Sequence, residues 1–257
     1  MLGTVSKAGR VLDLFTPALP EWGVSEVACQ LQVSKSSAHA LLSTLNEIGL
    51  VRRLPDGRYR LGWRILELNR SLLQSTDFLS GSTGRMQLLA DQLQATIHVA
   101  AVRDHSVLYL EKIRGAHSPD IGFSAVGLSA PAHCTALGKV LLASSDDAYT
   151  DAVIERYGLA RRTPETITSL PRLRTELDAI RLRGWGLDRE EAVTRVCCVA
   201  APVRDAHGGV QAAISISLST SQYRRNPEGV RRSVQKTAAW IGRAAYRTEP
   251  LMSGDVR

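Results

Sequence analysis

The sequence predicts two parts: a small, mainly helical N-terminal unit that ends in a β-hairpin, and a larger C-terminal α+β domain with an antiparallel sheet. Three patterns predict this division. Helical spacing of apolar residues dominates residues 7–47, an alternating hairpin pattern follows, and strand patterns enclose a helical middle after residue 95. With 257 residues, 44% of them hydrophobic and 22% charged, the chain is long enough for two folded domains.

The first unit begins with three short helices. Apolar residues have helical spacing over residues 7–15, and Pro17 ends that helix. Ser25 is the expected N-cap of a second helix, and Ser34 is that of a third helix over residues 35–47. The third helix is expected to stop at Gly49. Its expected buried stripe consists of Ala38, Leu41, Leu42 and Leu45.

A β-hairpin follows over residues 51–61, with a Pro-Asp-Gly turn at its centre. Side chains alternate between the two faces of a strand. We therefore expect Tyr59 and Leu61 to point inward, and Arg58 and Arg60 to point outward.

This order of elements is typical of a winged helix-turn-helix that binds DNA. Residues 35–70 contain seven Lys or Arg against three Asp or Glu, and the whole chain has a formal net charge of +7. The third helix would contact base edges, and the cations would contact phosphates. The candidate DNA-contacting residues are Ser25, Lys35, Ser36, Ser37, His39, Ser43, Arg52, Arg53, Arg58 and Arg60.

The second part is expected to combine helices with an antiparallel sheet. The expected helices cover residues 63–79, 83–93, 135–143, 147–157, 170–183 and 229–248. The expected strands cover residues 96–102, 107–113, 196–203 and 210–217.

One predicted hairpin carries polar residues on an apolar sheet. If residues 204 and 209 flank its loop and pair, Cys198 faces Ser215, and residue 196 faces Ser217. Alternation then places Cys198, Ser215 and Ser217 on one face, and the other face, with Ile214 and Ile216, belongs to the core. The sequence therefore predicts a small polar lining on this sheet.

The chain resembles the IclR-type bacterial transcriptional regulators, in segments that follow the order of that family. The matching segments are residues 33–42, 48–51, 58–62, 131–143, 163–167, 183–185, 189–191, 199–203 and 212–217. The resemblance implies a winged helix-turn-helix head (1–62), a linker helix (63–79), a GAF-like effector-binding domain (80–250) and a short tail (251–257). In one departure, Ala40 stands where the family usually has Arg after the histidine of the recognition helix.

The resemblance also implies partners: double-stranded DNA with a palindromic operator, a small-molecule effector, and other copies of the chain in a homodimer or a dimer of dimers. A small organic acid is the expected effector, because helix-start N–H groups and serine hydroxyls suit a carboxylate. The candidate effector-binding residues are His133, Thr135, Ala136, Leu137, Asp188, Cys198, Ser215 and Ser217.

Two alternatives remain open. In one, the DNA-binding head is kept but the signal is oxidation, sensed by Cys134, Cys197 and Cys198. In the other, Cys134 or Cys198 forms a nucleophile with His133 in an enzyme. We expect no enzyme, cofactor or metal site, since the histidines lack a ligand spacing and no nucleotide-binding motif occurs. Without a membrane-length apolar run or a signal peptide, a cytoplasmic location is expected.

Overall fold

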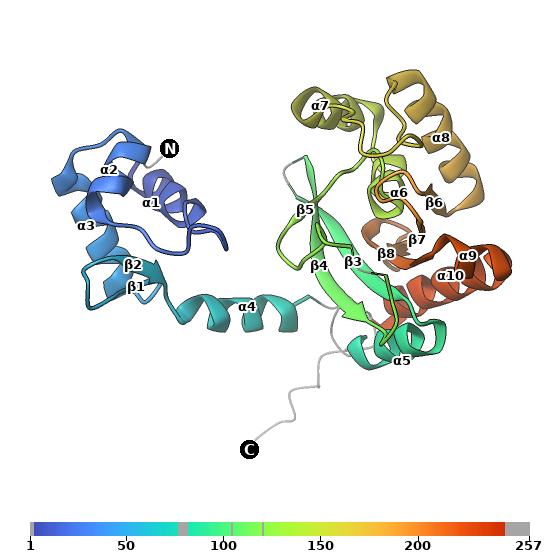
Figure 1. Ribbon diagram of the computed structural model, residues 1–257, viewed down its shortest axis with the longest axis horizontal. Helices are drawn as coiled ribbons and strands as arrows, with labels where there is room; N and C mark the ends of the chain where they lie inside the picture. The colour runs from blue at the N-terminus through green and yellow to red at the C-terminus, as the bar shows by residue number, and fades with distance from the viewer. Residues whose placement is uncertain (1–2, 77–81, 104, 120, 245–257) are drawn as a thin grey trace, which may run out of the picture. The chain divides into compact units, whose positions relative to one another are not determined.

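The computed structural model describes residues 3–76, 82–103, 105–119 and 121–244, and it divides the chain into two compact units, Met1–Ser75 and Thr76–Arg257 (Figure 1). The predicted fold class is confirmed: a helix-turn-helix unit with a two-stranded hairpin, followed by an α+β domain with an antiparallel sheet.

The first unit packs three helices against the hairpin. Its elements are α1 (Gly3–Asp13), α2 (Val24–Leu31), α3 (Lys35–Glu47), β1 (Val51–Arg53), β2 (Tyr59–Leu61) and α4 (Arg64–Gln74). Val11, Val27 and Leu42 are fully buried between the helices, and Tyr59 joins this core from the hairpin. The predicted cap of α3 is confirmed, because the Ser34 hydroxyl accepts from the Ser37 N–H at 3.2 Å. Gly49 ends the helix with φ +77°, a conformation that favours glycine.

Three local predictions in this unit differ from the structure. The N-cap of α2 is Gly23 rather than Ser25, because the Glu26 carboxylate reaches back and accepts from the Gly23 N–H at 2.7 Å. Leu61 is 37% exposed rather than core, because it is the last residue of β2 and lies beyond the buried cluster that contains Tyr59. Leu41, predicted to be buried, is only half-buried.

The helix α4 presents apolar side chains to solvent. None of its residues is buried, and Leu66, Leu68 and Leu72 are all more than half exposed. Trp63, directly before the helix, is 69% exposed. Residues 77–79 of the predicted linker helix lie outside the described residues.

The second unit is built on a six-stranded antiparallel sheet in the order β5-β4-β3-β8-β7-β6. The strands are β3 (Thr96–Arg103), β4 (Ser106–Arg114), β5 (Ser129–Ala130), β6 (Gly186–Arg189), β7 (Val196–Arg204) and β8 (Val210–Ser219). The helices are α5 (Thr83–Leu93), α6 (Ala136–Ala143), α7 (Asp147–Tyr157), α8 (Leu170–Arg183), α9 (Thr220–Arg225) and α10 (Pro227–Ala244). The elements β5, β6 and α9 were not predicted, and residues 245–248 of the predicted last helix lie outside the described residues.

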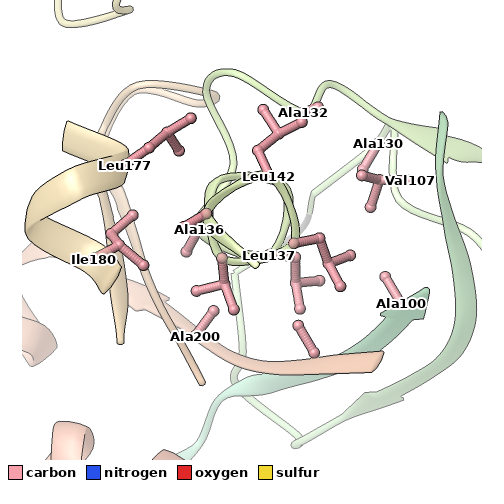
Figure 2. Packing of buried hydrophobic residues seen from close by; sticks show 14 of the residues in the cluster. Ala100, Val107, Ala130, Ala132, Ala136, Leu137, Leu142, Leu177, Ile180 and Ala200 are labelled. Carbon is pink, nitrogen blue, oxygen red and sulfur yellow. The ribbon is translucent and has the colours of Figure 1, made fainter. Parts of the chain in front are cut away.

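Helices cover both faces of this sheet. On one face, α6 packs on the small residues Ala100, Ala200 and Ala213, which let the helix approach the strands closely (Figure 2). Residues between them along the strands, such as Ile214, point to the other face, where α5 and α10 contact the sheet. This explains why β8 is buried almost throughout.

The predicted register of β7 and β8 is wrong by two residues. Cys198 pairs with Ser217, and Ala200 pairs with Ser215, because Arg204 pairs with Val210 and a bulge follows at residues 203–204. A slip of two residues keeps every side chain on its face, whereas a slip of one would not. Cys198, Ser215 and Ser217 therefore still share one face, as predicted.

Candidate functional site

The exposed side of α3 carries the polar residues that the sequence proposes for DNA. Lys35, Ser36, Ser37 and His39 are exposed, and Ser43 is half-buried. The hydroxyls of Ser36 and Ser37 each lie 2.9 Å from the Ser34 hydroxyl, so the start of the helix is already an ordered hydroxyl cluster. Ser25 is exposed on α2, without the capping role predicted for it.

The two arginines of β2 and its turn pair with carboxylates of the same unit. Arg58 forms two hydrogen bonds with the Glu26 carboxylate, at 2.8 and 3.1 Å, and Arg60 forms an ion pair with Glu21. The Gly23 N–H and Arg58 hold the pKa of Glu26 below its usual value. Arg58 and Arg60 are half-buried. The carboxylates of Glu26 and Glu21 neutralise much of their charge within the unit.

Among the proposed DNA-contacting residues, the three other cations have no carboxylate within ion-pair distance in the part of the chain that the structure describes. These are Lys35 at the start of α3, and Arg52 and Arg53 on β1. The Arg52 guanidinium lies over the Trp63 ring, 5.4 Å from its centroid, and Arg53 is exposed. The available positive charge of the hairpin thus lies on β1 rather than β2.

In the second unit, seven of the eight proposed effector residues line one cavity of about 20 Å³. They are Thr135, Ala136, Leu137, Asp188, Cys198, Ser215 and Ser217. The sheet register explains their meeting, because Asp188 pairs with Cys198 and Cys198 pairs with Ser217 across three neighbouring strands. A cavity of this volume holds about one water molecule.

The eighth residue, His133, does not reach this cavity. Its Nε2 lies 3.1 Å from the carbonyl oxygen of Ala160, and the ring lines a different cavity. His133 lies in the turn that leads into α6, and it lines the other cavity while Thr135, two residues later, lines this one. The structure therefore does not bring His133 together with the sheet residues.

Sequence reasoning missed the other residues that line the cavity, among them His98 on β3, Tyr109 on β4 and Phe123 in the loop before β5. The pairing of His98 with Ser215 places the histidine on the same face as the predicted polar lining. That signal depends on knowing that β3 and β8 are neighbours. The position of Phe123 depends on a loop and has no comparable signal in the sequence.

Asp188 is the buried acid of the cavity, with 1% exposure. Its Oδ1 accepts from the N–H groups of Glu191 at 2.7 Å and Ala192 at 3.3 Å. Burial, with the neighbouring Glu191 carboxylate, raises the pKa of Asp188 to about 7. A protonated Asp188 donates a hydrogen bond, which an ionised one cannot do.

The other polar groups of the cavity differ in how well they are satisfied. Ser217 is 1% exposed, and its hydroxyl has no oxygen or nitrogen partner within the described residues; it lies against the Cys198 thiol, which is a weak hydrogen-bonding group. The Nε2 atom of the His98 ring has a defined partner. The Ser124 hydroxyl donates to the Ile121 carbonyl at 2.8 Å, so it must accept from the His98 Nε2–H at 3.0 Å. Burial lowers the pKa of His98 to about 3, so the ring is neutral.

The start of α6 forms one end of the cavity. Thr135 caps the helix, accepting from the Gly138 N–H at 3.1 Å and donating to the Pro131 carbonyl at 2.7 Å. The N–H groups of the first helical turn lack intrahelical acceptors in any α-helix. A Cβ on Gly138 would lie 2.4 Å from the backbone of Ala132, so this glycine lets the helix pack on the segment before it.

A buried ion pair supports the wall that holds Asp188. Lys139 on α6 is 1% exposed, and its ammonium lies 2.5 Å from Glu191, 3.5 Å from Glu176 and against the Leu187 carbonyl. Glu191 in turn donates its backbone N–H to Asp188. Lys139 therefore links α6 to the cavity wall at residues 187–191.

The cysteines near this site lie in apolar surroundings. Burial raises the pKa of Cys134 to about 12, and it raises the pKa values of Cys197 and Cys198 as well. Since the thiolate is the reactive form, the raised pKa values lower the share of reactive thiolate at neutral pH. The described residues contain no cluster of three metal-ligating side chains, and no described helix is long and apolar enough to span a membrane.

Both units match models of one protein family. Residues 70–243 match the C-terminal domain of the bacterial transcriptional regulator IclR, and residues 4–55 match the IclR helix-turn-helix domain. The transcriptional regulator XynR of Escherichia coli is 34% identical over 223 residues, which are 86% of this chain and 88% of that protein. The regulator KdgR of Dickeya chrysanthemi is 32% identical over 204 residues, covering 79% of this chain and 67% of that protein.

Solved structures agree with this match. A putative transcriptional regulator from Rhodococcus sp. RHA1 has a TM-score of 0.82 at 25% identity, over 97% of this chain and 100% of that one. An IclR homologue from Microbacterium hydrocarbonoxydans, solved as a complex with 4-hydroxybenzoate, has a TM-score of 0.79 at 22% identity, over 94% and 99% of the two chains.

Proposed function

This chain belongs to the IclR family of bacterial transcriptional regulators, and from that premise we propose which residues bind its DNA and what its second unit senses. The chain is a DNA-binding transcriptional regulator, and its relatives are regulators rather than enzymes. We propose that a small organic acid is the effector and that the cavity between α6 and the sheet binds it.

The poorly satisfied hydroxyl of Ser217, which has only the weak Cys198 thiol beside it among the described residues, is the observation that carries this proposal. A buried hydroxyl without a strong partner costs up to about 1–3 kcal/mol, and a ligand atom in the cavity would recover that loss. The Ser215 hydroxyl and a protonated Asp188 add two more donors, and the start of α6 adds backbone N–H groups. Together these donors suit a carboxylate.

The cavity volume favours a ligand that enters only when the wall opens. About 20 Å³ holds a water molecule but no organic acid. The bulky side chains of Leu137, Tyr109 and Phe123 fill the space around the polar groups. We infer that the described conformation is the closed, ligand-free form, and that an effector stabilises a more open one.

The relatives support the chemical class of the effector. The Microbacterium homologue was solved with 4-hydroxybenzoate, a small acid that also carries a hydroxyl. An ionised acid in this cavity needs hydrogen-bond donors, and a ligand hydroxyl needs an acceptor such as Asp188 when that residue is ionised.

For DNA, we propose that Ser36 and His39 contact base edges while Lys35, Arg52 and Arg53 contact phosphates. Their exposure and the lack of described carboxylate partners for the three cations support this division. Arg58 and Arg60 would contribute less, because Glu26 and Glu21 already neutralise them. The roles of Ser25, Ser37 and Ser43 remain the proposals made from the sequence.

We also propose that the chain acts as a homodimer or a dimer of dimers on a palindromic operator. The exposed apolar side chains of α4 suit contact with a second copy, because Leu66, Leu68 and Leu72 would otherwise stay in water. Two heads would then address half-sites about 34 Å apart, one turn of the DNA helix. An effector would change operator affinity by favouring one placement of the heads.

The effector proposal is tested by calorimetric titration of the full chain with hydroxy acids, keto acids and aromatic acids. We expect one class to bind wild-type protein and to change its affinity for DNA from upstream of its own gene. Ser217→Ala should weaken that acid about tenfold, the effect of losing a hydrogen bond to a charged group. Ser144→Ala, on the exposed end of α6, is the matched control and should bind normally.

Two outcomes would contradict the proposal. One is that no acid binds and operator affinity is the same with every acid. The other is that an acid binds equally well to wild-type protein and to Ser217→Ala, which would place its site elsewhere.

A further inference from the structure

A second cavity lies on the other side of the segment that leads into α6. Its volume is about 260 Å³, and it is separate from the cavity that contains Ser217. The walls include Val107 on β4 and Ile154 and Tyr157 on α7. Val107 and its partner Ala130 lie side by side in Figure 2. A cavity of about 150 Å³ already accommodates a benzene ring, so this one has space for a ring and a substituent.

One cation, Arg162, lines this cavity and has no carboxylate partner among the described residues. Arg162 is exposed, and its guanidinium lies over the Phe123 ring, 4.5 Å from the centroid. Its Nε donates to the Ala192 carbonyl at 3.4 Å, but no carboxylate lies within ion-pair distance of it in the described residues. Stacking and one hydrogen bond hold the guanidinium in place while leaving its terminal nitrogens for a ligand.

His133 is one of the polar residues that line this cavity, together with His105, Ser106 and Ser129. The Ala160 carbonyl can only accept, so the ring donates through Nε2–H at 3.1 Å. Burial lowers the pKa of His133, which keeps the ring neutral and leaves Nδ1 as an acceptor. The cavity thus combines apolar walls, one available cation and two imidazoles, those of His133 and His105.

We propose that this second cavity binds a small aromatic carboxylate, with Arg162 as the partner of its carboxylate group. The ring of the ligand would lie against Val107, Ile154 and Tyr157, and its carboxylate would face the terminal nitrogens of Arg162. Planar guanidinium groups bind carboxylates through two parallel hydrogen bonds, so the pairing is directional as well as electrostatic.

The two cavities are lined by neighbouring residues, although no residue lines both. Residues 131–133 line the second cavity, Thr135 lines the first, and Phe123 of the first cavity supports Arg162 of the second. A ligand in the second cavity would therefore press on the start of α6, where the first cavity ends. By linkage, each ligand would change the affinity of the other by the same factor.

The test is a fluorine-NMR titration of the full chain with 4-fluorobenzoate, compared with the uncharged 4-fluorobenzamide. We expect 4-fluorobenzoate to bind wild-type protein, and to bind Arg162→Gln at least about tenfold more weakly, as a charge-assisted hydrogen bond is lost. Arg162→Lys keeps the charge and should bind with intermediate affinity. Arg161→Gln removes the adjacent arginine, which does not line the cavity, and should bind like wild type.

Ser217→Ala separates this proposal from the first one. If 4-fluorobenzoate binds that variant like wild type but binds Arg162→Gln weakly, the second cavity is its site, whatever the effector of the first cavity is. The proposal is overturned if Ser217→Ala abolishes binding while Arg162→Gln leaves it unchanged. It is also overturned if the benzoate does not bind, or binds no better than the benzamide.

Discussion

The two units use the same kinds of residue in opposite environments. In the head, Ser36 is exposed and its hydroxyl already has a partner in Ser34, whereas in the second unit, called the sensor unit below, Ser217 is buried and has only the weak Cys198 thiol beside its hydroxyl. Charge follows the same contrast: Arg53 of the head is exposed, and Lys139 of the sensor unit is 1% exposed and held by Glu191. A surface group contributes through long-range charge, which salt screens, while a buried group contributes through single contacts that salt hardly changes.

The largest expected effect breaks the buried side of this contrast. Lys139→Met leaves the Glu191 carboxylate buried without its cation, and removing one partner of a buried pair costs about 3–5 kcal/mol. We expect urea denaturation, followed by circular dichroism, to give a much lower midpoint for the transition of the sensor unit.

Matched variants test the cause of that loss. Adding Glu191→Gln to Lys139→Met should restore part of the stability, because the unpaired charge is removed. Arg174→Met breaks the exposed pair with Asp151 and should change the midpoint little. Equal effects of Lys139→Met and Arg174→Met would remove the distinction between buried and surface pairs.

The next effect concerns Asp188 and pH. Its pKa rises from an ordinary 3.8 to about 7 on folding, so the folded state binds a proton that the unfolded state releases. The sensor unit should therefore lose stability as pH rises from about 4 to about 7, and then level off. Above about pH 7, ionised Asp188 should repel a carboxylate effector. The affinity for that effector should then fall, approaching a tenfold loss for each pH unit.

Asp188→Asn should remove both trends, and unfolding and titration calorimetry from about pH 5 to about pH 8 would measure them. His98, in the same cavity, should not contribute, because its pKa of about 3 keeps it neutral over that range. If Asp188→Asn retains the wild-type pH profile, another group is responsible for it.

A smaller effect is expected for the exposed charges of the head. Arg53→Gln should weaken binding to any DNA and reduce the slope of log K against log salt by about 0.9, the change for one lost phosphate contact. Arg58→Gln should reduce the slope less, because Glu26 already neutralises Arg58. Glu26→Gln should increase the slope by releasing that arginine, and fluorescence anisotropy across a salt series would measure all three.

Base-contacting residues provide the control for these variants. His39→Ala should change the preference between operator and scrambled DNA while leaving the salt slope unchanged. An equal slope change for Arg53→Gln and Arg58→Gln would show that the ion pair with Glu26 does not persist on DNA.

The smallest effect is expected from the thiols. Cys29 is exposed, whereas burial raises the pKa of Cys134 and Cys198. Iodoacetamide should label Cys29 first, as followed by mass spectrometry, and Cys198→Ala should respond to peroxide as wild type does. A loss of DNA binding in peroxide that depends on Cys198 would instead favour the redox alternative.

The accuracy of sequence reasoning also differs between the units. The cap at Ser34 and the stop at Gly49 depend on residues within one turn, so local rules predict them. The pairing of Arg58 with Glu26 crosses 32 residues, and local alternation does not predict it. In the sensor unit, strand alternation predicts that Cys198, Ser215 and Ser217 share one face. Their exact pairing depends on a β-bulge that no residue pattern indicates. The contribution of His98 required the order of the strands, which the sequence does not state.

The closed cavity has a consequence for the time course of the response. If an effector enters only after the wall between α6 and the sheet opens, the observed binding rate should rise with effector concentration and then reach a plateau. The plateau is the opening rate, a property of the protein and not of the ligand. Since Lys139 and Glu191 join α6 to that wall, their ion pair would determine how quickly the regulator registers a change in its surroundings.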